Sequence, residues 1–121
     1  MGAITTTLTI TSSEVLSDTL NLSLTDSLKA VTEPSKFARI SILHTAPTEL
    51  AAVSTGAHYV YIKNISSING KPVDIRIAAG TAYGQIATGE FAFIPCKVNL
   101  GVEVIAIDET VVIEYAIFKK A

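Results

Sequence analysis

The sequence predicts an all-β fold, an antiparallel β-sandwich or jelly roll of about eight short strands in a single domain over residues 1–121. Short segments alternate between apolar and polar residues, and turn residues separate them. No segment has a convincing helical pattern. An extended strand over residues 1–12 is a further element that this domain could carry.

The N-terminal third contains three of the expected strands. Residues 4–10 are rich in β-branched side chains and alternate aliphatic residues with threonines. Residues 19–25 place three leucines on one face and polar residues on the other, as in a half-buried strand. Residues 36–43 follow Pro34 and also favour an extended conformation.

The middle of the chain continues the pattern after a loop. Residues 45–56 are expected to form this loop, with room for one helical turn. Residues 58–63 form a strand, and Asn69-Gly70 then predicts a tight hairpin. In the next strand, residues 73–77, Asp74 and Arg76 share the outward face, where we expect an ion pair.

The C-terminal third begins with glycines that mark a corner around residues 85–87. The stretch GEFAFIPCK, residues 89–97, is interpreted as a packed wall of the sheet with Phe91, Phe93 and Pro95 on one side. Residues 102–107 and 111–118 are strands, and Asp108-Glu109-Thr110 between them predicts a hairpin connection.

The composition argues against several classes of partner. The formal net charge is −2 and the basic residues are scattered, so no positive surface is available for nucleic acid. No apolar run of 18 residues exists, so we expect no membrane partner. Only 17% of the residues are charged, against about 25% in an average soluble domain, which predicts a surface short of charge.

The last two expected strands are largely apolar on both faces. Alternate residues should be polar where a sheet faces water, and this pair breaks that rule. Each large apolar side chain left in water forgoes about 1.5–3 kcal/mol, so a cover is expected. Either a segment of the same chain or a neighbouring subunit could provide it, and we favour the neighbouring subunit. The candidate interface residues are Val102, Val104, Ile105, Ile107, Val112, Tyr115, Ile117 and Phe118.

Nothing in the sequence assembles a catalytic set. Cys96 could act as a nucleophile only with a base, for which His44 and His58 are the candidates, and a structural thiol is the favoured interpretation. Two histidines without a third ligand at a recognisable spacing do not predict a metal site. We therefore expect no enzyme activity, no catalytic or metal-binding residues and no cofactor.

Three tyrosines form a candidate aromatic patch. Tyr59 and Tyr61 share one face of their strand, and Tyr83 could join them in a platform for sugars or for a protein partner. The alternative is that these side chains cap the core with their hydroxyl groups at its rim. The glycosylation sequons at Asn21 and Asn64 are interpreted as chance matches.

Three segments carry a resemblance to a known class of protein: Tyr59-Val60-Tyr61-Ile62-Lys63-Asn64, then Gly89-Glu90-Phe91-Ala92-Phe93-Ile94-Pro95, and Val112-Ile113-Glu114-Tyr115-Ala116-Ile117-Phe118. Together they resemble the strands of small β-sandwich virion proteins of tailed bacteriophages, of the capsid decoration or cement type. The similarity covers roughly residues 57–118, and it involves no motif that carries chemistry.

The resemblance implies structural work in a virion assembled in the host cytoplasm. We expect a decoration protein that forms a homo-oligomer, with a trimer favoured, and that docks on the major capsid protein or another virion protein to stabilise the shell. A tail, connector or fibre component is the nearest alternative. A carbohydrate-binding module that uses Tyr59, Tyr61 and Tyr83 is a third.

Overall fold

The structure is a computed structural model. It describes residues 2–12, 20–30, 36–51, 57–67, 71–77, 80–97 and 101–120. These residues form ten strands in three antiparallel sheets, with no helix among them, so the predicted all-β class is confirmed. The chain divides into two compact units, residues 1–32 (with residue 121) and residues 33–120. Each unit is described by itself.

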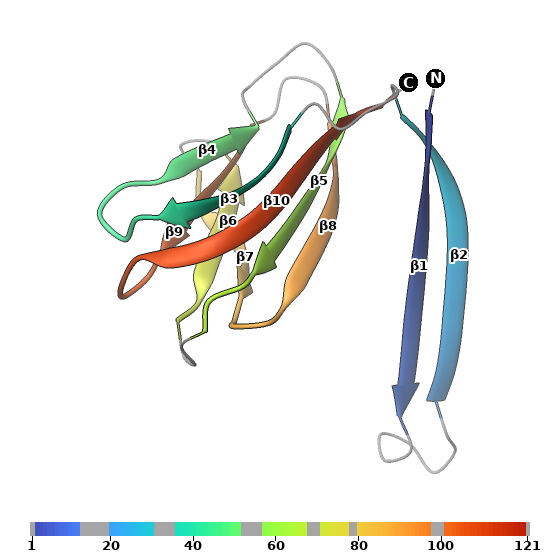
Figure 1. Cartoon of the computed structure of the whole chain (residues 1–121), viewed down its shortest axis with the longest axis horizontal. Helices are drawn as coiled ribbons and strands as arrows, with labels where there is room; N and C mark the ends of the chain where they lie inside the picture. The colour runs from blue at the N-terminus through green and yellow to red at the C-terminus, as the bar shows by residue number, and fades with distance from the viewer. Residues whose placement is uncertain are drawn as a thin grey trace. The chain divides into compact units, whose positions relative to one another are not determined.

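The strands follow one another along the chain as shown in Figure 1. The first unit holds β1 (Gly2–Ser12) and β2 (Leu20–Ala30). The second unit holds β3 (Lys36–Ile42), β4 (Thr48–Ala51), β5 (His58–Asn64), β6 (Val73–Ile77), β7 (Ala82–Ile86), β8 (Phe91–Cys96), β9 (Val102–Ala106) and β10 (Val111–Lys119).

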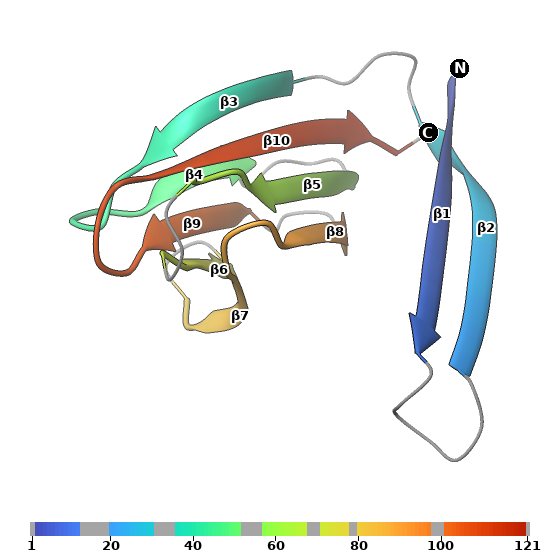
Figure 2. The ribbon, with the colours of Figure 1, turned by 60° about the horizontal axis from the view of Figure 1, so that its bottom comes forward.

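The second unit is a sandwich of two four-stranded sheets (Figure 2). One sheet has the order β3-β10-β5-β8 and the other has the order β4-β9-β6-β7. The two sheets are therefore built from strands that are far apart in the sequence, which is the connectivity of an eight-stranded jelly roll. The predicted sandwich or jelly roll is confirmed.

Both predicted hairpins are wrong in their pairing. β9 and β10 flank Asp108-Glu109-Thr110 but belong to different sheets, and so do β5 and β6, on either side of Asn69-Gly70. Residues 68–70 themselves lie outside the described residues. Turn residues indicate that the chain changes direction, but they do not distinguish a return along the same sheet from a crossing to the opposite sheet.

Two short strands occur where the sequence predicted a loop and a corner. β4 pairs with β9 through a register shift between Glu49 and Ala51. β7 pairs with β6 through a second shift, between Ile75 and Arg76. Neither segment has the regular alternation that predicts a strand, because the irregular pairing breaks the two-residue period.

The core lies between the two sheets and is almost entirely aliphatic. One face of each central strand contributes to it, with Val60 and Ile62 from β5, Ile113 from β10 and Val104 from β9 fully buried. Tyr115 is the largest side chain in this core. The predicted alternation of β6 is confirmed, since Val73 and Ile75 are buried between more exposed neighbours.

The first unit is a long hairpin in which 11 residues of β1 pair with 11 residues of β2. The ladder pairs Ile4 with Leu28 and Leu8 with Leu24, and between these it pairs Thr5 with Ser27 and Thr7 with Thr25. The predicted strands at residues 4–10 and 19–25 thus belong to this hairpin, apart from Thr19, which lies outside the described residues.

Candidate interaction surface

The outer face of the β3-β10-β5-β8 sheet carries six of the eight aromatic residues of the chain. Residues directly opposite each other in an antiparallel ladder lie on the same face. The ladder sets Tyr61 opposite both Ala116 and Phe93, and Ala116 opposite Phe37. One row therefore crosses all four strands. We call this surface the aromatic face; it comprises Phe37, Tyr59, Tyr61, Phe91, Phe93, Pro95, Ala116 and Phe118.

The aromatic face is ordered at its centre and open at its edges. Tyr59 stacks on Phe93 with 5.5 Å between ring centroids, and the Lys120 ammonium lies 4.8 Å from the centre of the Tyr59 ring. Phe37 on β3 and Phe91 on β8 are each 62% exposed. All four phenylalanines of the chain lie on this face. A surface of this kind is typical of a site that binds another macromolecule.

A small polar network borders the aromatic rows. Arg39 on β3 donates to the Glu114 carboxylate at 3.1 Å, and the Tyr61 hydroxyl donates to the same carboxylate at 3.3 Å. Burial raises the pKa of Tyr61, and the negative charge of Glu114 raises it further. The network therefore holds the phenol as a neutral donor and fixes one ring of the aromatic face.

The outer face of the β4-β9-β6-β7 sheet is different in chemistry. Arg76 donates to Glu103 at 2.7 Å, and Gln85 donates to Asp74 at 2.7 Å. We call this surface the polar face. The expected ion pair between Asp74 and Arg76 is wrong, because each finds a partner on a neighbouring strand, where opposite residues are closer than residues two apart on one strand.

The hairpin unit also has an apolar face. It is formed by aliphatic residues of β1 and β2 that oppose each other in the ladder, and its described members are Ile4, Leu8, Ile10, Leu24 and Leu28. The polar pair Thr6–Asp26 interrupts this face between the Ile4–Leu28 and Leu8–Leu24 pairs. Leu8, Ile10 and Leu24 are 44%, 42% and 56% exposed. On the other face Thr7 and Thr25 approach within 3.3 Å through their hydroxyl oxygens. The hairpin is therefore amphipathic.

Half of the predicted interface residues lie inside the sandwich. Val102, Val104, Tyr115 and Ile117 are buried against the opposite sheet. The expectation that these four need another chain to cover them is corrected, because β9 and β10 belong to facing sheets whose inner faces share one core. Phe118 lies on the aromatic face, Val112 and Ile107 are exposed, and Ile105 is partly exposed.

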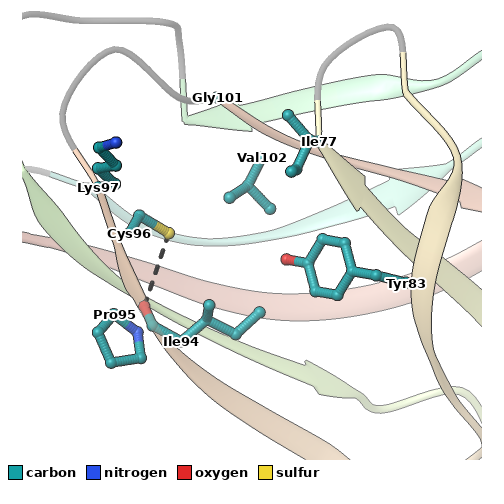
Figure 3. Close-up of a pocket in the computed structure, with 8 residues that line it drawn as sticks. All are labelled: Ile77, Tyr83, Ile94, Pro95, Cys96, Lys97, Gly101 and Val102. Atoms are coloured by element: carbon teal, nitrogen blue, oxygen red, sulfur yellow. Dashed lines mark hydrogen bonds between the residues drawn. The ribbon is translucent and has the colours of Figure 1, made fainter.

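The candidate tyrosine patch is divided between two places. Tyr59 and Tyr61 lie together on the aromatic face, as predicted from their spacing. Tyr83 lies on β7 in the other sheet and lines a pocket of about 270 Å³ together with Cys96, Ile94 and Ile77 (Figure 3). The structure therefore does not bring the three tyrosines into one platform.

Cys96 is a buried thiol that lines this pocket. Its Sγ lies 3.6 Å from the Ile94 carbonyl oxygen, as Figure 3 shows. Burial raises the pKa of the Cys96 thiol, and Lys120 lowers it by a smaller amount. His58 is also buried and stands opposite Cys96 in the β5–β8 ladder, whereas His44 is exposed in the loop after β3. The environment thus favours the thiol over the nucleophilic thiolate.

Asn64 has a structural role that its sequon does not suggest. It is fully buried, its amide donates to the carbonyl oxygens of Lys71 and Ile86, and its side-chain oxygen accepts from the Ser66 N–H. Asn64 thus joins the end of β5 to the end of β7. An amide held in this way is not available to carry a glycan.

The aromatic face is the feature that sequence reasoning missed as a whole. The sequence predicts that GEFAFIPCK forms a packed wall with Phe91, Phe93 and Pro95 on one side, and the structure shows that the core lies against the opposite side, with Ile94 and Cys96. A signal was present, because Tyr59, Tyr61, Phe91 and Phe93 each alternate with aliphatic residues. Their assembly with Phe37 and Phe118 depends on strand order, which the sequence does not state.

Two kinds of feature are absent from the residues that the structure describes. Within the described ranges, no group of three or more His, Cys, Asp or Glu side chains is arranged to hold a metal ion. Across the same part of the chain, no helix is long and apolar enough to cross a bilayer.

No family model matches the chain, and the curated proteins and solved structures give no match either.

Proposed function

We propose that this protein is a structural subunit of a bacteriophage virion, a capsid decoration or cement protein that associates with itself and docks on the shell to stabilise it. The observation that carries this proposal is the aromatic face, a four-stranded apolar surface on the outside of a sandwich that already has a complete core. Such a surface serves contact between polypeptides.

The energetics favour a permanent cover over this face. Phe37 and Phe91 are largely exposed, and removal of one such ring from water stabilises a complex by about 1.5–3 kcal/mol. Aromatic residues are also enriched in the cores of protein interfaces and dominate their binding energy. A subunit present in many copies would gain this stabilisation at every contact.

Two weaker considerations agree with a virion role. The jelly roll recurs in viral capsid domains, which is an analogy at the level of fold. The similarity of residues 57–118 to small phage virion proteins includes five of the six aromatic residues on the aromatic face.

The decisive experiment adds the purified protein to capsids that lack decoration. We expect saturable binding in hundreds of copies and a higher temperature of capsid disruption. Phe91→Ser should weaken binding, whereas Gln85→Ser, an exposed change on the polar face, should not. Absence of binding to heads would reject the capsid role, and a copy number of tens per virion would indicate a tail or connector component instead.

A carbohydrate-binding role is the second candidate, favoured by the position of Tyr59 and Tyr61 on one exposed sheet face and by the recurrence of jelly rolls in lectins. Its aromatic platform would use Tyr59, Tyr61 and Phe93, without Tyr83. Binding on a glycan array that Tyr59→Ala abolishes would support this role over the structural one.

A further inference from the structure

We propose that the hairpin of one copy packs its apolar face on the aromatic face of a second copy, and that two copies exchange hairpins in this way. The inference deepens the proposed function by naming the surfaces that join the subunits. It also holds for the purified protein in the absence of any capsid, so the two can fail separately.

The hairpin requires a cover. A two-stranded sheet by itself is only marginally stable in water, and it becomes stable when a hydrophobic face packs on another element. The hairpin has such a face, with Leu8 opposite Leu24 and Ile4 opposite Leu28. Its other face is formed by threonine and serine, so the two sides of the hairpin differ sharply in what they can contact.

The aromatic face matches this apolar face in geometry. Both are antiparallel ladders in which side chains on one face recur every two residues, about 6.8 Å along the strand. Two such faces pack as layers about 10 Å apart with interdigitated side chains. The polar face offers no equivalent, because Arg76, Glu103, Asp74 and Gln85 occupy it.

The area available favours a reciprocal exchange between two copies. A strand of seven residues on the aromatic face is about 24 Å long and a hairpin is about 10 Å wide, so one contact buries about 500 Å² over both surfaces. Two reciprocal contacts bury about 1,000 Å², the lower limit for a stable interface. A ring of three would have a single contact at each interface, so this estimate favours a two-fold dimer over the expected trimer.

The connection between the units favours a second copy over the same chain. Only five residues, 31–35, join β2 to β3, and one of them is Pro34. Short connections favour exchange of an element between copies. The alternative, in which the hairpin covers the aromatic face of its own chain, is an outcome of the test.

Sedimentation of the full-length protein tests association. We expect a dimer, and Leu24→Asp should raise its dissociation constant at least about tenfold. Ser23→Asp adds the same charge to the adjacent residue on the other hairpin face and should leave the constant within about twofold. A monomeric wild-type protein, or equal effects of the two changes, would overturn the proposal.

Crosslinking tests which surfaces meet. An isotopically labelled Leu8→Cys chain is refolded together with an unlabelled Phe91→Cys chain and treated with a short bis-maleimide. We expect peptides that join the labelled hairpin to the unlabelled sheet, and far fewer with Thr7→Cys or Gln85→Cys as controls. A Leu8→Cys/Phe91→Cys chain that crosslinks only within itself would overturn the exchange.

The outcomes separate the two proposals. If the protein is a dimer with the expected crosslinks but does not bind undecorated capsids, the exchange of hairpins is supported and the virion role is rejected. If the protein is a monomer that binds capsids and stabilises them, the virion role is supported and the exchange of hairpins is rejected.

Discussion

Cys96 and His58 lie directly opposite each other across the β5–β8 ladder, and both side chains are buried. In spite of this pairing, the thiol is directed to the Ile94 carbonyl oxygen and its pKa is raised by burial. We expect alkylation of Cys96 by iodoacetamide at pH 8 to be slow in the folded protein and fast in urea. Rapid alkylation of the folded protein would show a thiolate and reopen a catalytic role.

The same thiol makes stability depend on pH. Because burial disfavours the thiolate, the folded chain keeps this proton at pH values where the unfolded chain loses it. The contribution is complete below the ordinary cysteine pKa of 9.0 and is lost as the pH rises from there through the folded pKa. Urea unfolding of wild type and Cys96→Ala at pH 7–10 should show a steeper alkaline decline in the wild type.

Asn64→Ala should be strongly destabilising. The change removes two donated hydrogen bonds and one accepted bond at a fully buried position, and it leaves the Lys71 and Ile86 carbonyl oxygens short of a donor. We expect a loss of about 2–4 kcal/mol in the free energy of unfolding, measured in urea. Gln85→Ala, which removes one exposed bond to Asp74, serves as the control and should cost less than about 0.5 kcal/mol.

The two cross-strand ion pairs, Arg76–Glu103 and Arg39–Glu114, should contribute differently to the free energy of unfolding. Glu103 is 12% exposed beside Arg76 and faces Glu49 on the next strand, whereas Arg39 of the other pair is 70% exposed. Arg76→Ala leaves two carboxylates opposite each other and should cost about 1–3 kcal/mol. Arg39→Ala should cost about 0–1 kcal/mol. Equal losses in urea unfolding would contradict this difference in burial.

Substitutions at Tyr115 and Phe91 compare the contribution of the core to stability with that of the aromatic face. Tyr115→Ala removes a buried core ring and should cost about 3–5 kcal/mol. Phe91→Ala alters an exposed ring and should cost less than about 1 kcal/mol under conditions where the protein is monomeric. Unfolding by urea at low protein concentration makes this comparison. A small effect of Tyr115→Ala would mean that the sandwich leaves β10 uncovered.

Gly89 is required by its backbone conformation. Its φ angle is +85°, in the left-handed region, and its N–H donates to the Asn64 carbonyl oxygen. Gly89→Ala should cost about 1–2 kcal/mol through backbone strain alone, since a Cβ meets no atom within 4 Å. Gly84→Ala also meets no atom within 4 Å and is the control, with an expected change near zero in thermal unfolding.

Most strand positions could be predicted from the sequence because alternation is a local property. The strand around Val73 and Ile75 was predicted with its bounds, and those around Val60 and Ile113 within a residue or two. β4 and β7 were missed because they are short and carry bulges, so their side chains do not alternate regularly.

The pairing of strands could not be predicted, and the candidate site depends on it. Asn69-Gly70 and Asp108-Glu109-Thr110 predict turns, and the sequence alone gives no reason to choose a crossing between sheets over a hairpin. Once β10 lies between β3 and β5, Phe37 and Phe118 join Tyr61 on one face. The apolar residues on both faces of β10 thus have two explanations, the core on one side and the aromatic face on the other.

The two outer faces of the sandwich differ in chemistry, so the molecule has one aromatic side and one polar side. Under the proposed function, a layer of subunits whose aromatic faces are covered would present Arg76, Glu103, Asp74 and Gln85 to the surrounding water, with Ile105 only partly exposed among them. We therefore expect such a coat to be one molecule thick.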